Sequence, residues 1–460
     1  MTKRILWAVT AAGCLMAQAP SFEGDWQGTL EAGPVKYRLG LHVTRTQEGK
    51  FASTLDSIDQ GAMGIPVEGT TVSGNSLRLD MPGLQAKFEG KLSEGGESIE
   101  GTFTQGAALP LVWKRAATAA AAPARPQTPK PPFPYASEEV SYQNKAAGIM
   151  LAGTLTLPRG NRPFPAVILI TGSGTHDRDE TLFGHKPFLV IADYLTRRGI
   201  AVLRVDDRGA GSSTGSKSTS TIPDMAGDVL AGIAYLKGRG EIDGRRIGLI
   251  GHSEGAEIGP YAASQSPDVA FVVLLAGPGV PGDELLRKQA ELVIRAQGGG
   301  EAAVAQNRVV QDAMLKIIKE EKDPAAAGER IRAAFKELAP GTPEGAVTAN
   351  SHVTAELRSI VTYDPAPALH TLKMPVLALN GARDVQVSST QNLPAISSAL
   401  KAAANPDFIV TELPRLNHLF QTCQTCTVAE YGALEETFAP AALQMMGDWI
   451  TRHAAAPAAQ

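Results

Sequence analysis

The pentapeptide Gly-His-Ser-Glu-Gly at 251–255 places a serine between two glycines with the spacing G-x-S-x-G. It follows the apolar run RIGLI, which is typical of a buried strand, and precedes GAEIGPYAASQ, which favours a helix. A strand-to-helix turn this sharp needs glycine two residues on either side of the serine, because side chains there would collide with neighbouring elements. We therefore predict that Ser253 is a nucleophile displayed on this turn.

A serine hydroxyl is a weak nucleophile near neutral pH, so a base must accept its proton. Among the eight histidines, His418 follows the apolar segment DFIVTEL and so lies at the carboxyl end of a late predicted strand. His252 adjoins Ser253, but on such a turn its side chain would point away from the serine. His418 is therefore the predicted base.

A carboxylate must hold that base in the productive tautomer. Asp384 ends the segment MPVLALNGARD and so also follows a predicted strand. Asp364 and Asp407 are weaker alternatives, because Asp364 precedes its strand and Asp407 begins one. In chain order, the predicted catalytic residues are Ser253, Asp384 and His418.

Negative charge that develops on an attacked carbonyl oxygen needs fixed hydrogen-bond donors, commonly two backbone N–H groups. Glu254, directly after the nucleophile, is predicted to supply one of them. The other is expected from the loop TGSG after the run FPAVILI, from Ser173 with Gly174 as the alternative. Gly172 and Gly174 would let the backbone approach a substrate, and a plain tight turn is the competing interpretation of this loop.

The side chain of Glu254 admits two interpretations. At the start of a helix a carboxylate is stabilised by exposed N–H groups, so the side chain can be structural or can pair with Arg208 of DDRGAGSS. It can instead bind a substrate ammonium group. We favour the structural or ion-pairing role.

Five short, continuous apolar runs, several of them separated by segments of helical spacing, follow residue 160. They are FPAVILITGSG, IAVLRVDDRG, RIGLIGHSEG, VAFVVLLAGPG and MPVLALNGARD. This alternation predicts an α/β domain with a mostly parallel sheet, helices on both faces and chemistry at the carboxyl ends of the strands. We assign it to residues 137–280 and 363–454. Residues 281–362 contain amphipathic helical stretches without strands, which predicts a helical cap insertion over that edge of the sheet.

The N-terminal part of the chain has a different pattern. Residues 21–115 contain short alternating apolar segments separated by turn-rich sequence, which predicts a small all-β domain, either a barrel or a sandwich. Its single histidine, His42, is expected to be structural. The Ala- and Pro-rich stretch 116–136 is predicted to be an interdomain linker.

Residues 1–19 are typical of a secretory signal peptide. Two basic residues precede an apolar run, and Ala17-Gln18-Ala19 forms a small-residue cleavage site. We expect an exported protein, periplasmic or secreted, that is cleaved after Ala19, with a lipid anchor on Cys14 as the alternative. No later stretch approaches ~20 consecutive apolar residues, so no membrane span is expected.

The composition of the chain argues against nucleic acid as a partner and against a metal cofactor. The chain has 43 Lys and Arg against 47 Asp and Glu, a net charge of −4, and so lacks the basic surplus of most nucleic-acid-binding proteins. Cys423 and Cys426 can form a small disulfide or remain two free thiols, and without a second pair or clustered histidines they make a poor zinc site. We expect neither a metal nor an organic cofactor, and the oligomeric state is left open.

From about residue 138 to residue 454 the chain resembles the α/β-hydrolase superfamily. Five motifs carry the resemblance, which are, in chain order, ITGSGTHDRDE, VDDRGAGSS, GHSEG, PVLALNGARD and LNHLF. The similarity is to the exported esterases and serine aminopeptidase-like hydrolases. It implies an α/β-hydrolase fold with a helical cap beside the small N-terminal all-β domain. It also implies Ser253 as nucleophile, Asp384 as acid, His418 as base, and an oxyanion hole from Ser173 and Glu254.

Two features depart from that family pattern. Many members have histidine where Thr171 stands, and the CQTC segment beside His418 is not a feature of the fold. Neither departure touches a reacting group, so both concern the geometry of the loops and not the predicted activity.

The predicted function is hydrolysis of a small-molecule carboxylic ester through an acyl-enzyme on Ser253. The alternative is an aminopeptidase or peptidase that acts on short peptides with the same three residues. It would need an anionic site for the substrate's α-ammonium group, for which the candidates are Glu254, Asp177, Asp179 and Glu180. A non-catalytic ligand-binding protein is a third, remote alternative, against which the complete catalytic set argues.

Overall fold

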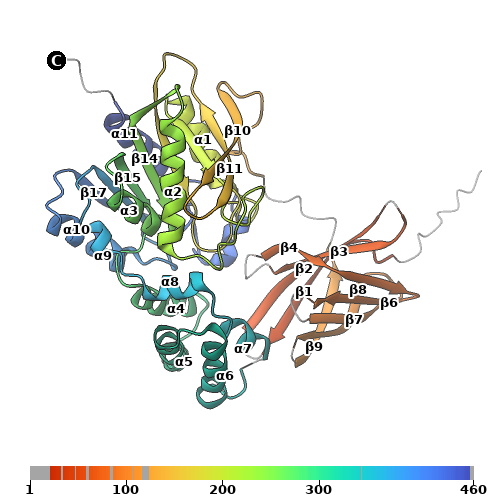
Figure 1. Cartoon of the computed structure of the whole chain (residues 1–460). Helices are drawn as coiled ribbons and strands as arrows, with labels where there is room; N and C mark the ends of the chain where they lie inside the picture. The colour runs from red at the N-terminus through yellow and green to blue at the C-terminus, as the bar shows by residue number, and fades with distance from the viewer. Residues whose placement is uncertain are drawn as a thin grey trace, which may run out of the picture. The chain divides into compact units, whose positions relative to one another are not determined.

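The computed structural model describes residues 21–32, 35–46, 48–57, 62–82, 86–105, 107–116, 124–342 and 344–455. The chain forms two compact units, Met1–Ala119 and Ala120–Gln460 (Figure 1). The predicted signal peptide lies outside the described residues. Within the described ranges, no helix combines the length and the apolar character needed to cross a membrane.

The N-terminal unit is a single antiparallel sheet in the order β4-β3-β2-β1-β9-β8-β7-β6-β5. Its strands are β1 Gly24–Ala32, β2 Val35–Arg45, β3 Phe51–Ser57, β4 Ala62–Val67, β5 Gly69–Ser73, β6 Ser76–Met81, β7 Ala86–Leu92, β8 Ser98–Gln105 and β9 Ala107–Arg115. Alternate side chains are buried in one cluster that includes Trp26, Phe88 and Trp113. The core therefore lies on one face of a single curled sheet rather than between two sheets.

His42 on β2 links three neighbouring strands of this sheet. Its Nδ1 lies 2.7 Å from Asp25 Oδ1 on β1, and its Nε2 lies 2.7 Å from Asp56 Oδ2 on β3. Partial burial of the ring opposes its charged form, but the hydrogen bonds with Asp56 and Asp25 outweigh burial, and the pKa of His42 is raised. The histidine thus has the structural role that the sequence predicts.

This arrangement predicts a pH-dependent contribution to stability. Because the pKa of His42 in the folded state lies above its unfolded value, its contribution is complete below about pH 6.5 and is lost as the pH rises through the folded-state value. Hydrogen-exchange mass spectrometry of the full chain would compare the wild type with His42→Gln at about pH 6 and about pH 9. We expect the wild type's extra protection of β1–β3 to shrink at the higher pH. Equal differences at the two pH values would contradict this role.

The C-terminal unit is built on an eight-stranded sheet in the order β10-β11-β13-β12-β14-β15-β16-β17. Its strands are β10 Ala136–Asn144, β11 Ile149–Leu157, β12 Phe164–Ile170, β13 Ala201–Val205, β14 Ile242–His252, β15 Val269–Leu275, β16 Val376–Gly381 and β17 Phe408–Leu413. Pairing is antiparallel between β10, β11 and β13 and parallel from β13 to β17. This mostly parallel sheet is that of an α/β-hydrolase fold, as predicted.

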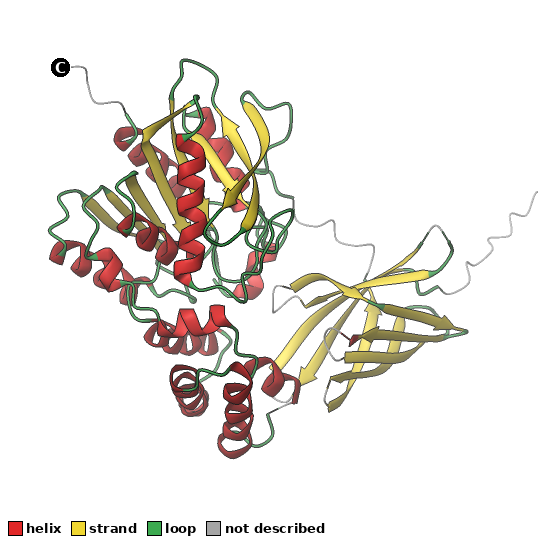
Figure 2. Ribbon diagram, viewed as in Figure 1, coloured by secondary structure: helices red, strands yellow, loops and turns green. Residues whose placement is uncertain are grey.

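Helices cover both faces of this sheet, as Figure 2 shows. They are α1 Pro187–Arg197, α2 Ile222–Lys237, α3 Gly255–Ser264, α9 Ala366–Leu369, α10 Ser389–Ala402 and α11 Pro440–His453. One buried cluster joins the sheet to α2, α3 and α10, and a second joins its other face to α1 and α11. Because both faces are covered, the parallel strands appear in the sequence as continuous apolar runs.

Three features of this unit are not among the sequence-predicted elements. One is strand β11, in which glycine and threonine interrupt the apolar residues. Strand β10 is an edge strand with mostly exposed or half-buried side chains, so it lacks the continuous apolar run by which the inner strands are recognised. Part of the predicted linker also belongs to this unit. Arg125 donates hydrogen bonds to the backbone oxygens of Phe183, Gly432 and Leu434.

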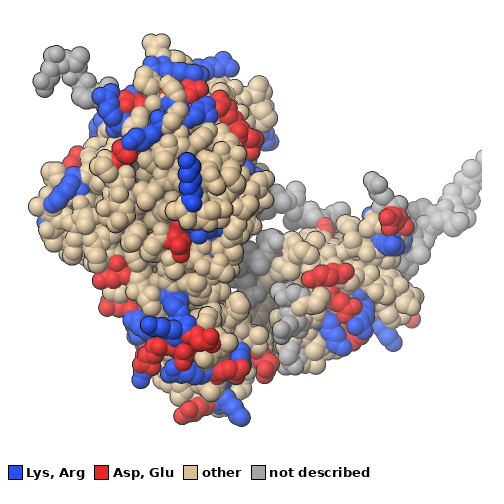
Figure 3. Space-filling view, viewed as in Figure 1, with Lys and Arg blue, Asp and Glu red and all other residues tan. Residues whose placement is uncertain are grey.

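Between β15 and α9, the described residues form five helices, where the sequence predicts a helical cap. They are α4 Gly282–Ala296, α5 Glu301–Glu320, α6 Pro324–Leu338, α7 Glu344–Asn350 and α8 Ala355–Thr362, and they gather at one end of the sheet (Figure 1). They share their own buried cluster, which includes Ile318, Ile331 and Phe335. On the face shown in Figure 3, charges of both signs are mixed over these helices, as expected for the solvated sides of amphipathic helices.

Candidate active site

Ser253 lies on the sharp turn between β14 and α3. Its φ is 54°, in the left-handed region that a non-glycine residue rarely adopts, and its N–H donates to Leu275 O at 2.9 Å. A Cβ on Gly251 would lie 2.0 Å from Gly255 O, and a Cβ on Gly255 would lie 2.2 Å from Ile170 O. Both glycines of the pentapeptide are therefore required by close backbone approach.

His418 and Asp384 meet at the carboxyl edge of the sheet. His418 Nδ1 lies 2.7 Å from Asp384 Oδ2, and both side chains are almost fully buried. The other oxygen of Asp384 accepts from the backbone N–H groups of Gln386 and Val387 at 2.8 and 2.9 Å. The carboxylate is thus fixed on three sides, so it holds Nδ1 as the protonated nitrogen and leaves Nε2 free to accept a proton.

The two alternative acids lie elsewhere. Asp364 accepts from the backbone N–H of Ala366 at 3.0 Å, and Asp407 Oδ2 lies 3.0 Å from His453 Nε2. Of the three carboxylates that the sequence offers, Asp384 is the one in contact with His418.

His252 connects the nucleophile turn to the base. Its Nε2 lies 3.0 Å from His418 O and its Nδ1 lies 3.0 Å from Glu180 Oε1, so its side chain is directed away from a catalytic position, as the sequence predicts. Among the described residues, the Ser253 hydroxyl makes no hydrogen bond with His418. Such contacts often form only when substrate binds.

The loop after β12 is adjacent to the nucleophile, since a Cβ on Gly172 would lie 3.2 Å from the Cβ of Ser253. The Gly172 N–H donates to Glu180 Oε1, and the Gly174 N–H donates to Glu356 Oε1 of α8, both at 2.8 Å. Within the described ranges, the N–H groups of Ser173 and Glu254 have no acceptor. Both groups are therefore unengaged, whereas the N–H of Gly174, the alternative donor, is already bonded to Glu356.

Lys217, in the loop between β13 and α2, is a site residue that sequence reasoning missed. Its side chain is 2% exposed, and Nζ lies 2.6 Å from Gly172 O, 3.0 Å from Asp207 Oδ2 and 3.7 Å from Glu254 Oε2. Burial disfavours its charge, but Asp207 and Glu254 outweigh burial and raise the pKa of Lys217. The segment GSKSTS around it is polar and without periodicity, so no signal in the sequence marks this lysine as buried.

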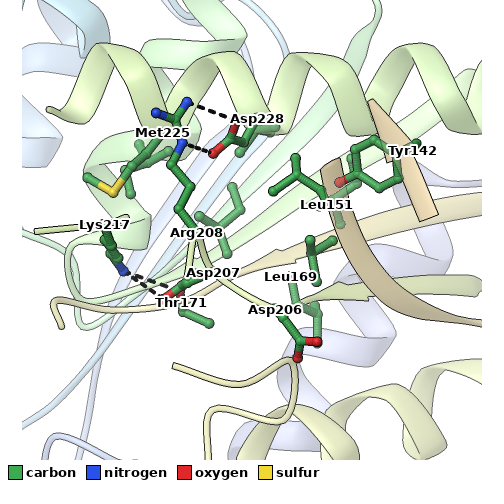
Figure 4. A pocket seen from close by; sticks show the side chains of 15 residues that line it. Tyr142, Leu151, Leu169, Thr171, Asp206, Asp207, Arg208, Lys217, Met225 and Asp228 are labelled. Carbon is green, nitrogen blue, oxygen red and sulfur yellow. Dashed lines mark hydrogen bonds and ion pairs between the residues drawn. The ribbon is translucent and has the colours of Figure 1, made fainter. Parts of the chain in front are cut away.

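Of the roles considered for the Glu254 side chain, pairing with Arg208 is not the one the structure shows. Arg208 instead pairs with Asp228, with Nε 2.5 Å from Oδ2 (Figure 4). Glu254 pairs with Lys217. Burial raises the pKa of Glu254 to about 7 against the opposing effect of Lys217. Neither carboxyl oxygen of Glu254 has a hydrogen-bond partner among the described residues.

The other candidates for an ammonium site are engaged in bracing their loop. Glu180 is buried against the Gly172 N–H and His252, and Asp179 is paired with Lys186 and Arg204. Asp177 accepts from the hydroxyl and the N–H of Thr181.

The segment beside His418 is closed by a disulfide between Cys423 and Cys426. Cys423 N–H donates to Arg415 O at 3.1 Å, and Leu416 pairs with Thr422 as an isolated bridge. The disulfide therefore stabilises the end of the loop that carries His418.

A cavity of about 50 Å³ lies between the sheet and α2 (Figure 4). The charged groups on its wall are paired as Arg208 with Asp228, Lys217 with Asp207, and Asp206 with Arg178. Ser253 is not among its lining residues.

Similar proteins are found by sequence and by structure. The chain is 31% identical over 238 residues to esterase EstD of Thermotoga maritima, covering 52% of this chain and 51% of that protein. It is 29% identical over 146 residues to esterase FrsA of Yersinia pestis, covering 32% of each. The chain thus spans about half, or less, of the length of these curated relatives. A solved esterase of Pyrococcus furiosus aligns with 70% of this chain and 92% of its own, with 16% identity and a TM-score of 0.42.

The model of one protein family matches residues 147–411, which is more than half of the chain. This stretch contains the strands β12–β16, the nucleophile turn, the cap and Asp384, and it ends shortly before His418. The chain belongs to the X-Pro dipeptidyl-peptidase family, peptidase family S15, within the α/β hydrolases.

Proposed function

We propose that the protein is a serine esterase that hydrolyses small carboxylic esters through an acyl-enzyme. The observation that carries the proposal is the strained serine turn beside a buried His418–Asp384 pair, with two backbone N–H groups free to receive an oxyanion. Esterase EstD and esterase FrsA, both similar in sequence to this chain, support an ester as the substrate.

The proposed reaction has two stages with the same proton carrier. His418 Nε2 accepts the Ser253 hydroxyl proton as Oγ attacks the ester carbonyl, and it then donates that proton to the departing alkoxide. Water next attacks the acyl-enzyme, gives its proton to Nε2 and releases the acid as Ser253 is reprotonated. The Ser173 and Glu254 N–H groups stabilise the oxyanion in both stages, and Asp384 stabilises the transient imidazolium.

A peptidase is the second candidate, and two observations favour it. The family model is that of X-Pro dipeptidyl-peptidases, and Glu254 keeps two buried carboxyl oxygens without hydrogen-bond partners beside the nucleophile. Against it, three of the four acidic candidates for binding a substrate ammonium are engaged within the protein.

The test compares p-nitrophenyl acyl esters of increasing chain length with aminoacyl p-nitroanilides, with and without a penultimate proline. We expect ester turnover that is lost in Ser253→Ala and little anilide cleavage. Faster anilide cleavage that requires a free amino group would instead establish the peptidase.

We also propose that the protein is exported after cleavage following Ala19. The Cys423–Cys426 disulfide supports this proposal, since disulfides persist in oxidising compartments. The intact mass of the protein recovered from periplasm or medium would identify its first residue, and a lipid-modified Cys14 would replace this proposal with membrane anchoring.

A further inference from the structure

The carbonyl of Gly172 and the N–H of Ser173 belong to one peptide unit. Because a peptide unit is planar, whatever fixes the direction of its carbonyl also fixes the direction of its N–H. Lys217 Nζ donates to Gly172 O at 2.6 Å, while the Ser173 N–H on the other side of the same unit has no acceptor among the described residues. The buried ammonium therefore controls the orientation of one of the two proposed oxyanion donors.

The same loop is tied to Lys217 a second time through Asp207. Asp207 Oδ2 binds Nζ at 3.0 Å and the His176 N–H at 2.9 Å, and its Oδ1 accepts from the Thr171 hydroxyl at 2.6 Å. Figure 4 shows Lys217 directed toward Asp207 and Thr171, and Arg208 directed toward Asp228. Asp207 thus holds both ends of the turn, and Lys217 holds the peptide at its centre.

The positive charge of Lys217 also strengthens the Ser173 N–H as a hydrogen-bond donor. A hydrogen bond to an amide carbonyl polarises the amide and strengthens its N–H as a donor. Nζ also lies 3.7 Å from Glu254 Oε2, so one ammonium contacts both the peptide unit that carries the Ser173 N–H and the side chain of Glu254. With its side chain 2% exposed, Lys217 keeps this effect unscreened by water.

We propose that Lys217 is a positioning residue for the oxyanion hole, which orients and polarises the Gly172–Ser173 peptide without touching the substrate. The inference rests on the proposed Ser253-dependent hydrolysis. It assigns to Lys217 an effect on the transition state, because the Ser173 N–H bonds most strongly to the oxygen when that oxygen becomes an anion. We expect the loss of Lys217 to leave the affinity for the unreacted substrate almost unchanged.

The test is Lys217→Met, which keeps a chain of similar length and removes the ammonium. Loss of one oxyanion donor lowers kcat by about 100- to 1000-fold, and we expect a misoriented donor to lower it by about 10- to 100-fold, with KM changed by less than about 3-fold. The rate at which a fluorophosphonate labels Ser253 should fall by a similar factor, since its tetrahedral adduct places an oxygen in the same site.

Lys217→Met leaves the half-buried carboxylate of Asp207 without its cation, which can destabilise the fold. The double variant Lys217→Met/Asp207→Asn removes both charges together and is expected to retain the lowered kcat. The matched control is Arg208→Met/Asp228→Asn, which removes a neighbouring ion pair that, among the described residues, makes no hydrogen bond or ion pair with residues 171–176. It should change kcat by less than about 3-fold.

The outcomes separate this inference from the function on which it rests. If the wild type shows no Ser253-dependent turnover or labelling, the proposed function fails and the inference fails with it. If the wild type is active, the inference is overturned by a normal kcat in Lys217→Met, by recovery of kcat in the double variant, or by a change confined to KM. An equal loss in the control pair would overturn it as well.

Discussion

Replacement of Ser253 by alanine is expected to lower kcat for p-nitrophenyl esters by about 10⁴-fold or more, and to leave the fold intact. Among the described residues the Ser253 hydroxyl has no hydrogen-bond partner, and the backbone N–H bond of Ser253 to Leu275 O does not depend on the hydroxyl. Steady-state kinetics with circular dichroism would measure both effects. A residual rate within about 100-fold of the wild type would contradict a nucleophilic Ser253.

A second substitution at the same position separates catalysis from strain. Holding a residue with a Cβ at φ 54° costs about 1 kcal/mol, and glycine adopts this conformation without that penalty. Ser253→Gly should therefore be as inactive as Ser253→Ala but more stable to chemical denaturation by about 1 kcal/mol. Ser264→Ala, which removes a serine hydroxyl bonded within α3, is the control and should retain full activity. Equal stability of the two Ser253 variants would contradict strain at this position.

Elements with a strong local pattern could be predicted from the sequence. The inner strands β12–β16 are buried on both faces, so each appears as an uninterrupted apolar run, and the carboxyl ends of those runs locate the loops of the site. The order of Ser253, Asp384 and His418 followed from that positional rule, and the structure brings Asp384 and His418 into contact.

Contacts between distant polar residues could not be predicted in the same way. Arg208 has several carboxylates within reach in the sequence, and only the folded loop shows that Asp228 on α2 is its partner. Glu356 occupies the Gly174 N–H from a helix more than 180 residues later, which no local pattern marks. The burial of Lys217 could not be predicted either, because a lysine in a polar loop is ordinarily exposed.

The substitution Asp384→Asn is expected to lower kcat by about 10³- to 10⁴-fold while changing KM little. The amide oxygen of the introduced side chain can still accept from the Gln386 and Val387 N–H groups, so the loop should keep its shape. The amide nitrogen would then face His418 Nδ1 and donate to it, which forces the proton of the neutral ring onto Nε2. In that tautomer Nε2 cannot accept the Ser253 proton, so the defect arises from the wrong protonation pattern and not from lost packing.

The alternative carboxylate supplies the control for this prediction. Asp407→Asn makes the same chemical change at the residue that pairs with His453, on the helix at the end of the unit, and should leave kcat within about 2-fold of the wild type. Thermal unfolding of both variants would show whether either change acts through stability. Comparable losses of kcat in the two variants, or full activity in Asp384→Asn, would remove Asp384 from the proposed mechanism. A selective loss would establish that the His418 tautomer is set at this one contact.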